Sequence, residues 1–173
     1  DMGTEVCGLL LGGKGVGEKM AKELGAYGAD KVLVCESDLL ETYTTDAYAK
    51  VLCDTVMAKK PEILLIAATN IGRDLGPRCA ARLHTGLTAD CTQLEIGDFP
   101  INPIPGKEQK HNQLLMTRPA FGGNTIATIA CPDNRPQMAT VRPGVMQKLD
   151  RVAGKKAEVI NYNPCLLYTS DAA

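Results

Sequence analysis

The stretch EILLIAATNIGRD (residues 62–74) predicts the fold, because an apolar run passes directly into a helix start. Its first half is almost continuously apolar, as in a strand covered on both faces. Thr69 or Asn70 can cap the helix that follows, whose free N–H groups favour an anion. Ligands bind at such strand ends in open α/β sheets, so this junction could hold a ligand or serve only as a cap. Arg73 and Asp74 could pair with one another or with a neighbouring subunit.

Strand and helix alternate in the same way on both sides of this stretch. Buried strands are predicted over residues 5–11 (EVCGLLL) and 31–35 (KVLVC), and helices over residues 15–26, 45–60 and 72–83. Such alternation is typical of a parallel sheet flanked by helices with right-handed crossovers. We therefore predict an α/β fold, a Rossmann-like three-layer sandwich with a mainly parallel sheet.

The second half of the chain has a different texture, rich in Thr, Ile and Val between Gly, Pro and Asn. It predicts additional, shorter and partly antiparallel strands, over residues 87–96, 113–116, 125–131 and 137–142. A surface loop is expected over residues 99–112. We predict one α/β domain over residues 1–147, a linker over 148–163 and a non-native tail over 164–173.

Composition excludes several classes of function. The 173 residues carry a formal net charge of −1 and no Trp, which argues against a nucleic-acid partner. No apolar run approaches the ~20 residues of a membrane helix, so membrane insertion is not expected. The seven cysteines are scattered, and we expect buried thiols in a reducing cytoplasm and no metal site. A mitochondrial matrix location is also compatible.

Two other features suggest chemistry but do not fit its requirements. The glycine-rich loop GGKGVG (residues 12–17) has Glu where the dinucleotide fingerprint needs its last glycine, and it lacks a phosphate-loop Gly-Lys-Ser/Thr. A plain turn before a helix is favoured there. Neither His84 nor His111 has an identifiable nucleophile or carboxylate partner, so no catalytic residue is predicted.

The segment TRPAFGGN (residues 117–124) allows two interpretations. Gly122, Gly123 and Asn124 suit a hairpin turn or bulge that needs positive φ, which leaves Arg118 as a surface charge. Alternatively, the segment presents a backbone and a cation to something large, flat and anionic.

Five segments resemble, in the same order, the N-terminal domain of the electron-transfer flavoprotein α subunit. They are AYGADKVLV (residues 26–34), YTTDAYAK (43–50), NIGRDLGPRCAARLHTGLTADCT (70–92), TRPAFGGNTIATI (117–129) and RPQMATVRPGVM (135–146). Members of that family are αβ heterodimers that carry electrons from flavin dehydrogenases, such as acyl-CoA dehydrogenases, to a downstream acceptor. The resemblance therefore implies an electron carrier, and no enzyme with its own substrate.

The resemblance also implies where the cofactors lie. The main FAD is held by a C-terminal α domain whose motifs are not found in this chain, and the β subunit holds a second FAD in bifurcating members or AMP in others. The arginine of the TRPAFGG motif, here Arg118, would face that second flavin. A guanidinium there favours anionic reduced forms and raises the reduction potential. Phe121, Gly122 and Gly123 would approach the ring, and Asn124 could hydrogen-bond its edge.

The chain departs from the family pattern at both ends. The family's first strand and helix have no counterpart before residue 1, and residues 164–173 match nothing expected of the family. Two other interpretations stay open: a stand-alone adenine-nucleotide-binding module of the universal-stress type, and a purely structural fragment without a ligand.

Overall fold

The computed structural model describes residues 4–102, 104–106, 108–152 and 154–162, apart from the side chains of residues 18 and 19. The chain divides into two compact units. The first unit comprises Asp1–Val51 and Lys148–Ala173, and the second unit comprises Leu52–Gln147. Among the described residues, the first unit contains one β-sheet and the second unit contains two.

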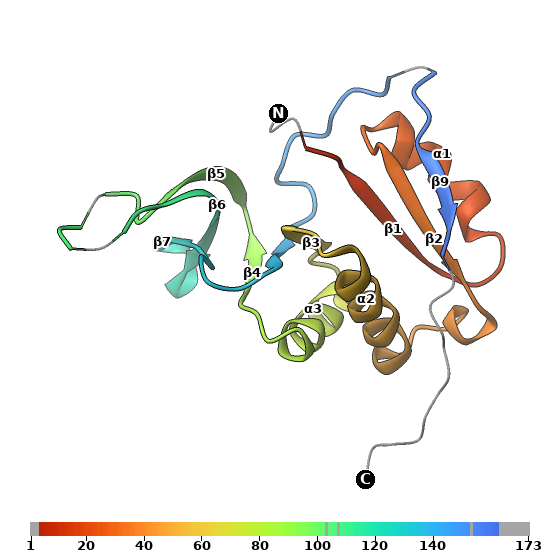
Figure 1. Cartoon of the computed structure of the whole chain (residues 1–173), viewed down its shortest axis with the longest axis horizontal. Helices are drawn as coiled ribbons and strands as arrows, with labels where there is room; N and C mark the ends of the chain where they lie inside the picture. Colours follow the sequence, from red (N-terminus) through yellow and green to blue (C-terminus); the bar gives the residue numbers. More distant parts are fainter. Residues whose placement is uncertain (1–3, 103, 107, 153, 163–173) are drawn as a thin grey trace, which may run out of the picture. The chain divides into compact units, whose positions relative to one another are not determined.

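The first unit is built on a three-stranded parallel sheet (Figure 1). Its order is β1-β2-β9, with β1 at Cys7–Gly12, β2 at Lys31–Glu36 and β9 at Glu158–Asn161. Helix α1 (Val16–Ala26) connects β1 to β2, and the short 3-10 helix η1 (Asp38–Leu40) follows β2. The central strand β2 is almost wholly buried because its Val, Leu and Cys side chains are covered on both faces.

The segment predicted as a linker, residues 148–163, contains strand β9. Residues Lys31 to Val34 of β2 pair in parallel with residues Glu158 to Asn161 of β9. Ala157, just before β9, packs against the core cluster of the first unit. A four-residue strand carries almost no periodicity of its own, so its pairing with β2 could not be read from the sequence. The predicted tail over residues 164–173 lies outside the described residues.

Helix α2 (Thr45–Lys59) begins in the first unit and continues into the second. In the first unit, Ala47 and Val51 pack with Cys35 of β2 and Leu40 of η1. The helix ends at Lys59, just before Lys60 with positive φ and Pro61, as the sequence predicts.

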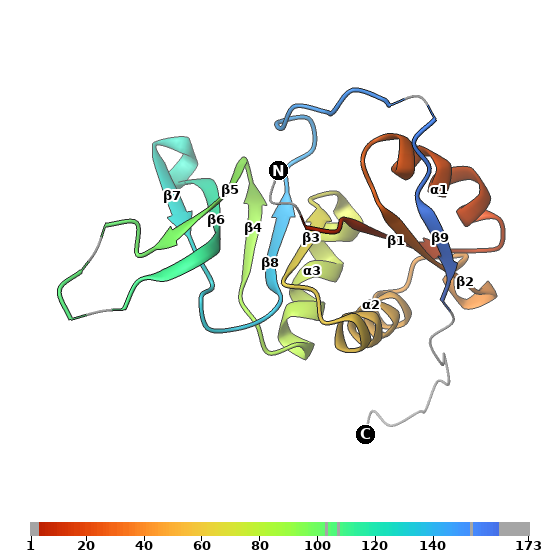
Figure 2. The ribbon, with the colours of Figure 1, turned by 45° about the horizontal axis from the view of Figure 1, so that its top comes forward.

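The second unit contains a parallel sheet of order β3-β8-β4. Its strands are β3 (Ile63–Ala67), β8 (Gln137–Val141) and β4 (Leu87–Cys91). Helix α3 (Asn70–Arg82) joins β3 to β4, and Figure 2 shows it against this sheet. Gly76 lets α3 approach closely, because a Cβ atom there would lie 3.0 Å from Thr140 Cγ2 of β8. These strands confirm the predicted α/β class with parallel pairing.

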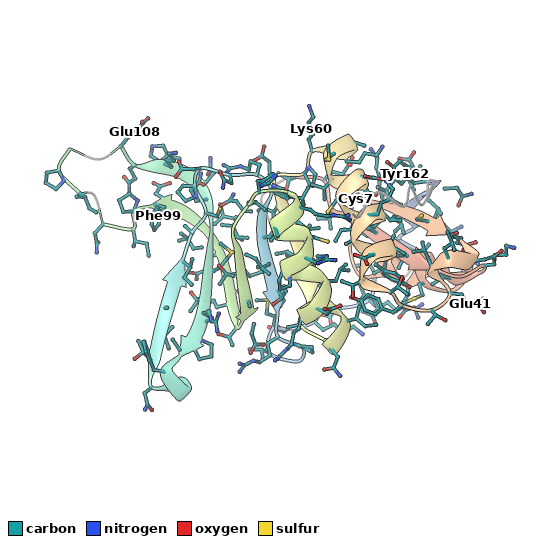
Figure 3. All side chains as sticks on the ribbon, turned by 90° about the horizontal axis from the view of Figure 1, so that it is seen from below. Cys7, Glu41, Lys60, Phe99, Glu108 and Tyr162 are labelled. Atoms are coloured by element: carbon teal, nitrogen blue, oxygen red, sulfur yellow. The ribbon has the colours of Figure 1, made fainter. Side chains whose placement is uncertain are left out.

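An antiparallel sheet of order β5-β6-β7 completes the second unit. It contains β5 (Gln93–Phe99), β6 (Lys110–Ala120) and β7 (Thr125–Ile129), with η2 (Phe121–Gly123) between the last two. Figure 3 labels Phe99 and Glu108 near the two ends of the loop that joins β5 to β6. The second half is thus antiparallel over residues 93–129 and parallel at β4 and β8. Leu114 and Met116 of β6 pack with Cys91 of β4 and Ala139 of β8, which joins the two sheets through one core.

The thiols lie largely where the sequence predicts them. Cys35, Cys53, Cys79 and Cys91 are buried, Cys131 is half-buried and Cys7 is exposed, while Cys165 lies outside the described residues. Over the described part of the chain, no helix combines the length and the apolar character that crossing a membrane requires.

Candidate functional site

The glycine-rich loop before α1 is occupied by a side chain of the protein itself. Gly17 N–H donates to Glu36 Oε1 at 2.9 Å. Bonds from Gly17 and Gly15 hold the pKa of the Glu36 carboxyl below its usual range. Glu36 ends β2, and its carboxylate takes the place at the helix start where a phosphate would bind. This geometry agrees with the prediction of a plain turn there.

The five residues that the sequence singles out lie together on one β-hairpin. Arg118 lies on β6 opposite Ala127 of β7, and the tip follows at Phe121, Gly122, Gly123 and Asn124. Three successive tip residues have left-handed backbone, with φ of 48° at Phe121, 68° at Gly122 and 91° at Gly123. The turn that the glycines predict is therefore present, with a phenylalanine in a conformation that non-glycine residues rarely adopt.

The hairpin exposes apolar side chains. Phe121 is 85% exposed and Ile126 of β7 is 72% exposed. Strand β7 also forms the edge of its sheet among the described residues. An exposed edge strand with large apolar side chains is a surface that natural proteins normally cover. The hairpin therefore has the character of a contact surface.

Arg118 points toward the parallel sheet. In a strand, alternate residues share a face, so Arg118 lies on the face of Met116, which packs against Cys91 of β4. The hydrogen bond from Thr92 N to Thr117 O, at 2.9 Å, holds this part of β6 beside the junction of β4 and β5. Within the described residues, the Arg118 side chain makes no hydrogen bond or ion pair.

Three residues that sequence reasoning did not combine form an ion-pair network next to Arg118. Asp90 accepts from Arg142 Nη2 at 2.6 Å and Nε at 3.1 Å, and from Arg73 Nη2 at 3.2 Å. Arg73 Nε also donates to the carbonyl oxygen of Ala68 at 3.1 Å. Arg73 thus pairs with Asp90, which lies 17 residues further along the chain, inside the strand predicted over residues 87–96.

Backbone contacts fix this network at the carboxyl ends of three parallel strands. Asp90 has a φ of 61° at an irregularity of β4, and its N–H donates to Thr140 Oγ1 of β8 at 2.8 Å. Arg142 directly follows β8, and its N–H donates to Cys91 O at 2.9 Å. Thr69 caps α3 by accepting from Gly72 N at 3.2 Å, which confirms one of the two capping residues that the sequence suggests.

The neighbouring arginines lower the pKa of the Asp90 carboxyl. The hydrogen bonds from Arg142 hold the pKa of the Asp90 carboxyl below its usual range, and the charges of Arg142, Arg73 and Arg118 lower it further, against the opposing effect of desolvation. Asp90 therefore stays ionised at any pH at which the protein is expected to work.

Replacing Asp90 by asparagine should lower the free energy of unfolding of the second unit by about 1–2 kcal/mol at pH 7, because charge-assisted hydrogen bonds are lost. The folded-state pKa of Asp90 lies below the unfolded one, so its contribution exists above about pH 4 and is lost as the pH falls through the folded value. The difference between wild type and variant should therefore shrink at about pH 3. Urea unfolding at both pH values measures it.

The matched control is Asp133→Asn, which removes a 76% exposed carboxylate paired with Lys110. Such surface pairs contribute little, so this variant should stay within about 0.5 kcal/mol of wild type. An equal loss in the Asp90 variant at pH 7 and pH 3 would contradict the assigned role of the Asp90 charge.

Comparison with known proteins identifies the family. Residues 1–167 match the model of the electron transfer flavoprotein domain. The chain belongs to the electron transfer flavoprotein family.

Two of the following three relatives are named electron transfer subunits, and the third is named a lactate dehydrogenase subunit. The chain is 59% identical over 162 residues to the acryloyl-CoA reductase electron transfer subunit beta of Anaerotignum propionicum, covering 87% of this chain and 43% of the relative. It is 58% identical over 148 residues to the electron transfer flavoprotein subunit alpha of Clostridium acetobutylicum, covering 86% and 40%. It is 44% identical over 143 residues to the LctC subunit of lactate dehydrogenase (NAD(+),ferredoxin) of Acetobacterium woodii, covering 83% and 31%.

The chain therefore spans only a part of its relatives. It covers 40–43% of the length of five curated relatives that are 49–59% identical to it. The first of them is named a beta subunit and others are named alpha subunits, although all align with the same chain.

Proposed function

We propose that this chain is part of an electron transfer flavoprotein α subunit and docks a β subunit through the β6–β7 hairpin. The complete αβ heterodimer would pass electrons from a flavin dehydrogenase, of the acyl-CoA dehydrogenase type or a related one, to a downstream acceptor. A role in fatty acid β-oxidation and a cytoplasmic location belong to the same proposal. The chain itself would turn over no substrate.

The observation that carries the proposal is the composition of the hairpin. A largely exposed phenylalanine with left-handed backbone follows, within three residues, an arginine whose side chain has no hydrogen bond or ion pair within the described residues. Strained backbone occurs mainly at functional sites, and exposed apolar side chains mark surfaces that contact a partner. Membership of the flavoprotein family supports a β subunit as that partner.

The hairpin also fits a flat anionic cofactor held by the partner. A Cβ atom at Gly122 or Gly123 would meet nothing within 4 Å among the described residues, so a large group can approach the backbone there. FAD or, in non-bifurcating relatives, AMP in the β subunit would lie at this position, and the main FAD would be held by a further α domain. When bound, the flavin supplies the reversible acceptance of electrons.

The residues of this chain would act on that cofactor without forming bonds to it. Arg118 would hold a fixed positive charge beside it and favour its negatively charged states. Phe121 would cover apolar surface at the seam and exclude water, which strengthens the effect of the charge. Asn124 could donate a hydrogen bond to the edge of the ring.

We further propose that the parent protein has the two-flavin, bifurcating form of this function. The support is the name of one relative, the LctC subunit of a lactate dehydrogenase (NAD(+),ferredoxin). The adenine-nucleotide module of the universal-stress type is disfavoured, both by the family match and because Glu36 occupies the glycine-rich loop.

Co-expression of the full-length α subunit with its β subunit tests the proposal. We expect a stable heterodimer that retains two nucleotide cofactors, at least one of them FAD, by mass and absorbance after purification. Phe121→Ala should weaken the heterodimer about tenfold, because aromatic anchors dominate interface energies. Isothermal titration of one subunit with the other measures this change.

The control is Met57→Ala, which truncates a 67% exposed apolar side chain of α2 in the second unit. We expect the affinity of this variant to equal that of wild type. Failure of the two subunits to associate at micromolar concentration, or an unchanged affinity in the Phe121 variant, would remove the hairpin from the interface.

A further inference from the structure

The carboxyl edge of the β3-β8-β4 sheet holds more positive charge than its own carboxylate neutralises. Arg73 and Arg142 bond Asp90 directly, and Arg118 acts on the same carboxylate through its charge. Three guanidinium groups and one carboxylate give these four side chains a net charge of two positive units. A cluster with that excess has the means to hold an anion.

Asp90 orients Arg73 and Arg142 but accepts hydrogen bonds from only some of their guanidinium N–H groups. Arg142 uses Nε and Nη2 on Asp90, and Arg73 uses Nη2 on Asp90 and Nε on Ala68 O. A guanidinium has five N–H groups, so the Nη1 atoms of both arginines keep donors without an acceptor in the described residues. The side chains are 57% exposed at Arg73 and 41% exposed at Arg142, so these donors are accessible from solvent.

Helix α3 begins at the same edge of the sheet. The first N–H groups of an α-helix have no acceptor within the helix. Here the Thr69 hydroxyl accepts from Gly72 N at 3.2 Å, and the Thr69 carbonyl oxygen accepts from Arg73 N at 2.9 Å. The positive end of the helix dipole therefore lies next to Arg73, in the first turn, and adds to the field of the arginines.

We propose that Arg73 and Arg142, positioned by Asp90 and aided by the charge of Arg118, bind a phosphate group. Planar guanidinium forks match phosphate oxygens in pairs, and the excess of two charges matches a phosphate dianion. The phosphate could be free or could belong to a nucleotide. The site stands on residues of the second unit alone and does not require a flavin at Arg118 or a β subunit.

Titration of the flavin-free, full-length protein with inorganic pyrophosphate at about 0.15 M salt tests the site by calorimetry. We expect saturable binding to wild type and at least tenfold weaker binding to the double variant Arg73→Gln/Arg142→Gln. Arg73→Gln alone leaves both Arg142 bonds to Asp90 intact and so preserves the fold; it should weaken binding about three- to tenfold.

Arg135→Gln is the matched control, because Arg135 is a half-exposed arginine of the second unit paired with Glu62 before the amino end of β8. Its affinity for pyrophosphate should equal that of wild type. Parallel titrations of wild type and the Arg73→Gln variant with AMP identify the source. Binding that is tighter than that of pyrophosphate and is weakened in the variant indicates a nucleotide phosphate, and equal or weaker binding indicates the free anion.

Absence of binding to wild type, or equal affinity in wild type and the Arg73 variants, would overturn the proposal. The result is independent of the test of the proposed function. A heterodimer can form and retain its flavins although the α subunit does not bind pyrophosphate. Conversely, the α subunit can bind pyrophosphate although no heterodimer forms.

Discussion

Replacing Gly72 by alanine is expected to destabilise the second unit by more than about 3 kcal/mol, or to prevent its folding. Gly72 lies in the first turn of α3, where the helix leaves β3. A Cβ atom there would lie 1.8 Å from the carbonyl oxygen of Ala67, the last residue of β3, and 3.1 Å from Ile66 Cγ2. Backbone cannot move aside as a flexible side chain can, so α3 would have to shift from the strand.

A glycine one turn further along the same helix provides the control. A Cβ atom at Gly76 would lie 3.0 Å from Thr140 Cγ2 and 3.4 Å from Leu87 Cδ2, which are side-chain atoms. Alanine has a helix propensity about 1 kcal/mol better than glycine, so Gly76→Ala should be close to neutral. Urea unfolding of both variants compares them. A Gly72 variant as stable as the Gly76 variant would show that α3 does not approach β3 as closely as described.

Replacing Arg118 by alanine should lower the one-electron reduction potential of the β-subunit flavin in the heterodimer by about 100 mV. A unit charge beside a water-excluded ring contributes about 2–3 kcal/mol at an effective dielectric constant of about 20, and about 1.4 kcal/mol corresponds to 59 mV for one electron. The removal of the charge destabilises the negatively charged reduced flavin more than the neutral oxidised one. Spectroelectrochemical titration of each bound flavin measures the shift.

Arg118→Lys separates charge from shape in the same experiment. Lysine keeps the positive charge but lacks the planar set of donors. We expect it to restore most of the potential while weakening retention of the cofactor. Unchanged potentials and unchanged flavin content in Arg118→Ala would remove this arginine from the flavin site.

The sequence predicted most elements of the fold because apolar periodicity is a local signal. The stretch over residues 62–74, for example, appears as β3 and α3 with Thr69 as the cap. Strand β9 escaped prediction because four residues stabilised by pairing with β2 have no periodic pattern to show. The parallel direction of β8 also depends on where the chain returns, with Gln137 N bonded to Glu62 O at 2.8 Å.

The candidate site was predictable only in part, for a related reason. The adjacent glycines Gly122 and Gly123 predict a turn from local sequence alone, and the structure has that turn. The Asp90 network joins residues 17 and 52 positions apart, and nothing local to Asp90 or Arg142 marks them as partners. Ion pairs between distant segments become visible only after the strands that carry them are placed in order.

The contact of Glu36 with the loop before α1 has a consequence for anion binding there. A carboxylate of the protein that already accepts from the backbone amides of Gly17 and Gly15 competes there with any anion from solvent. One substitution at that carboxylate would free these amides without disturbing the strands beneath it. The backbone amides at this helix start would then be open to an anion from solvent.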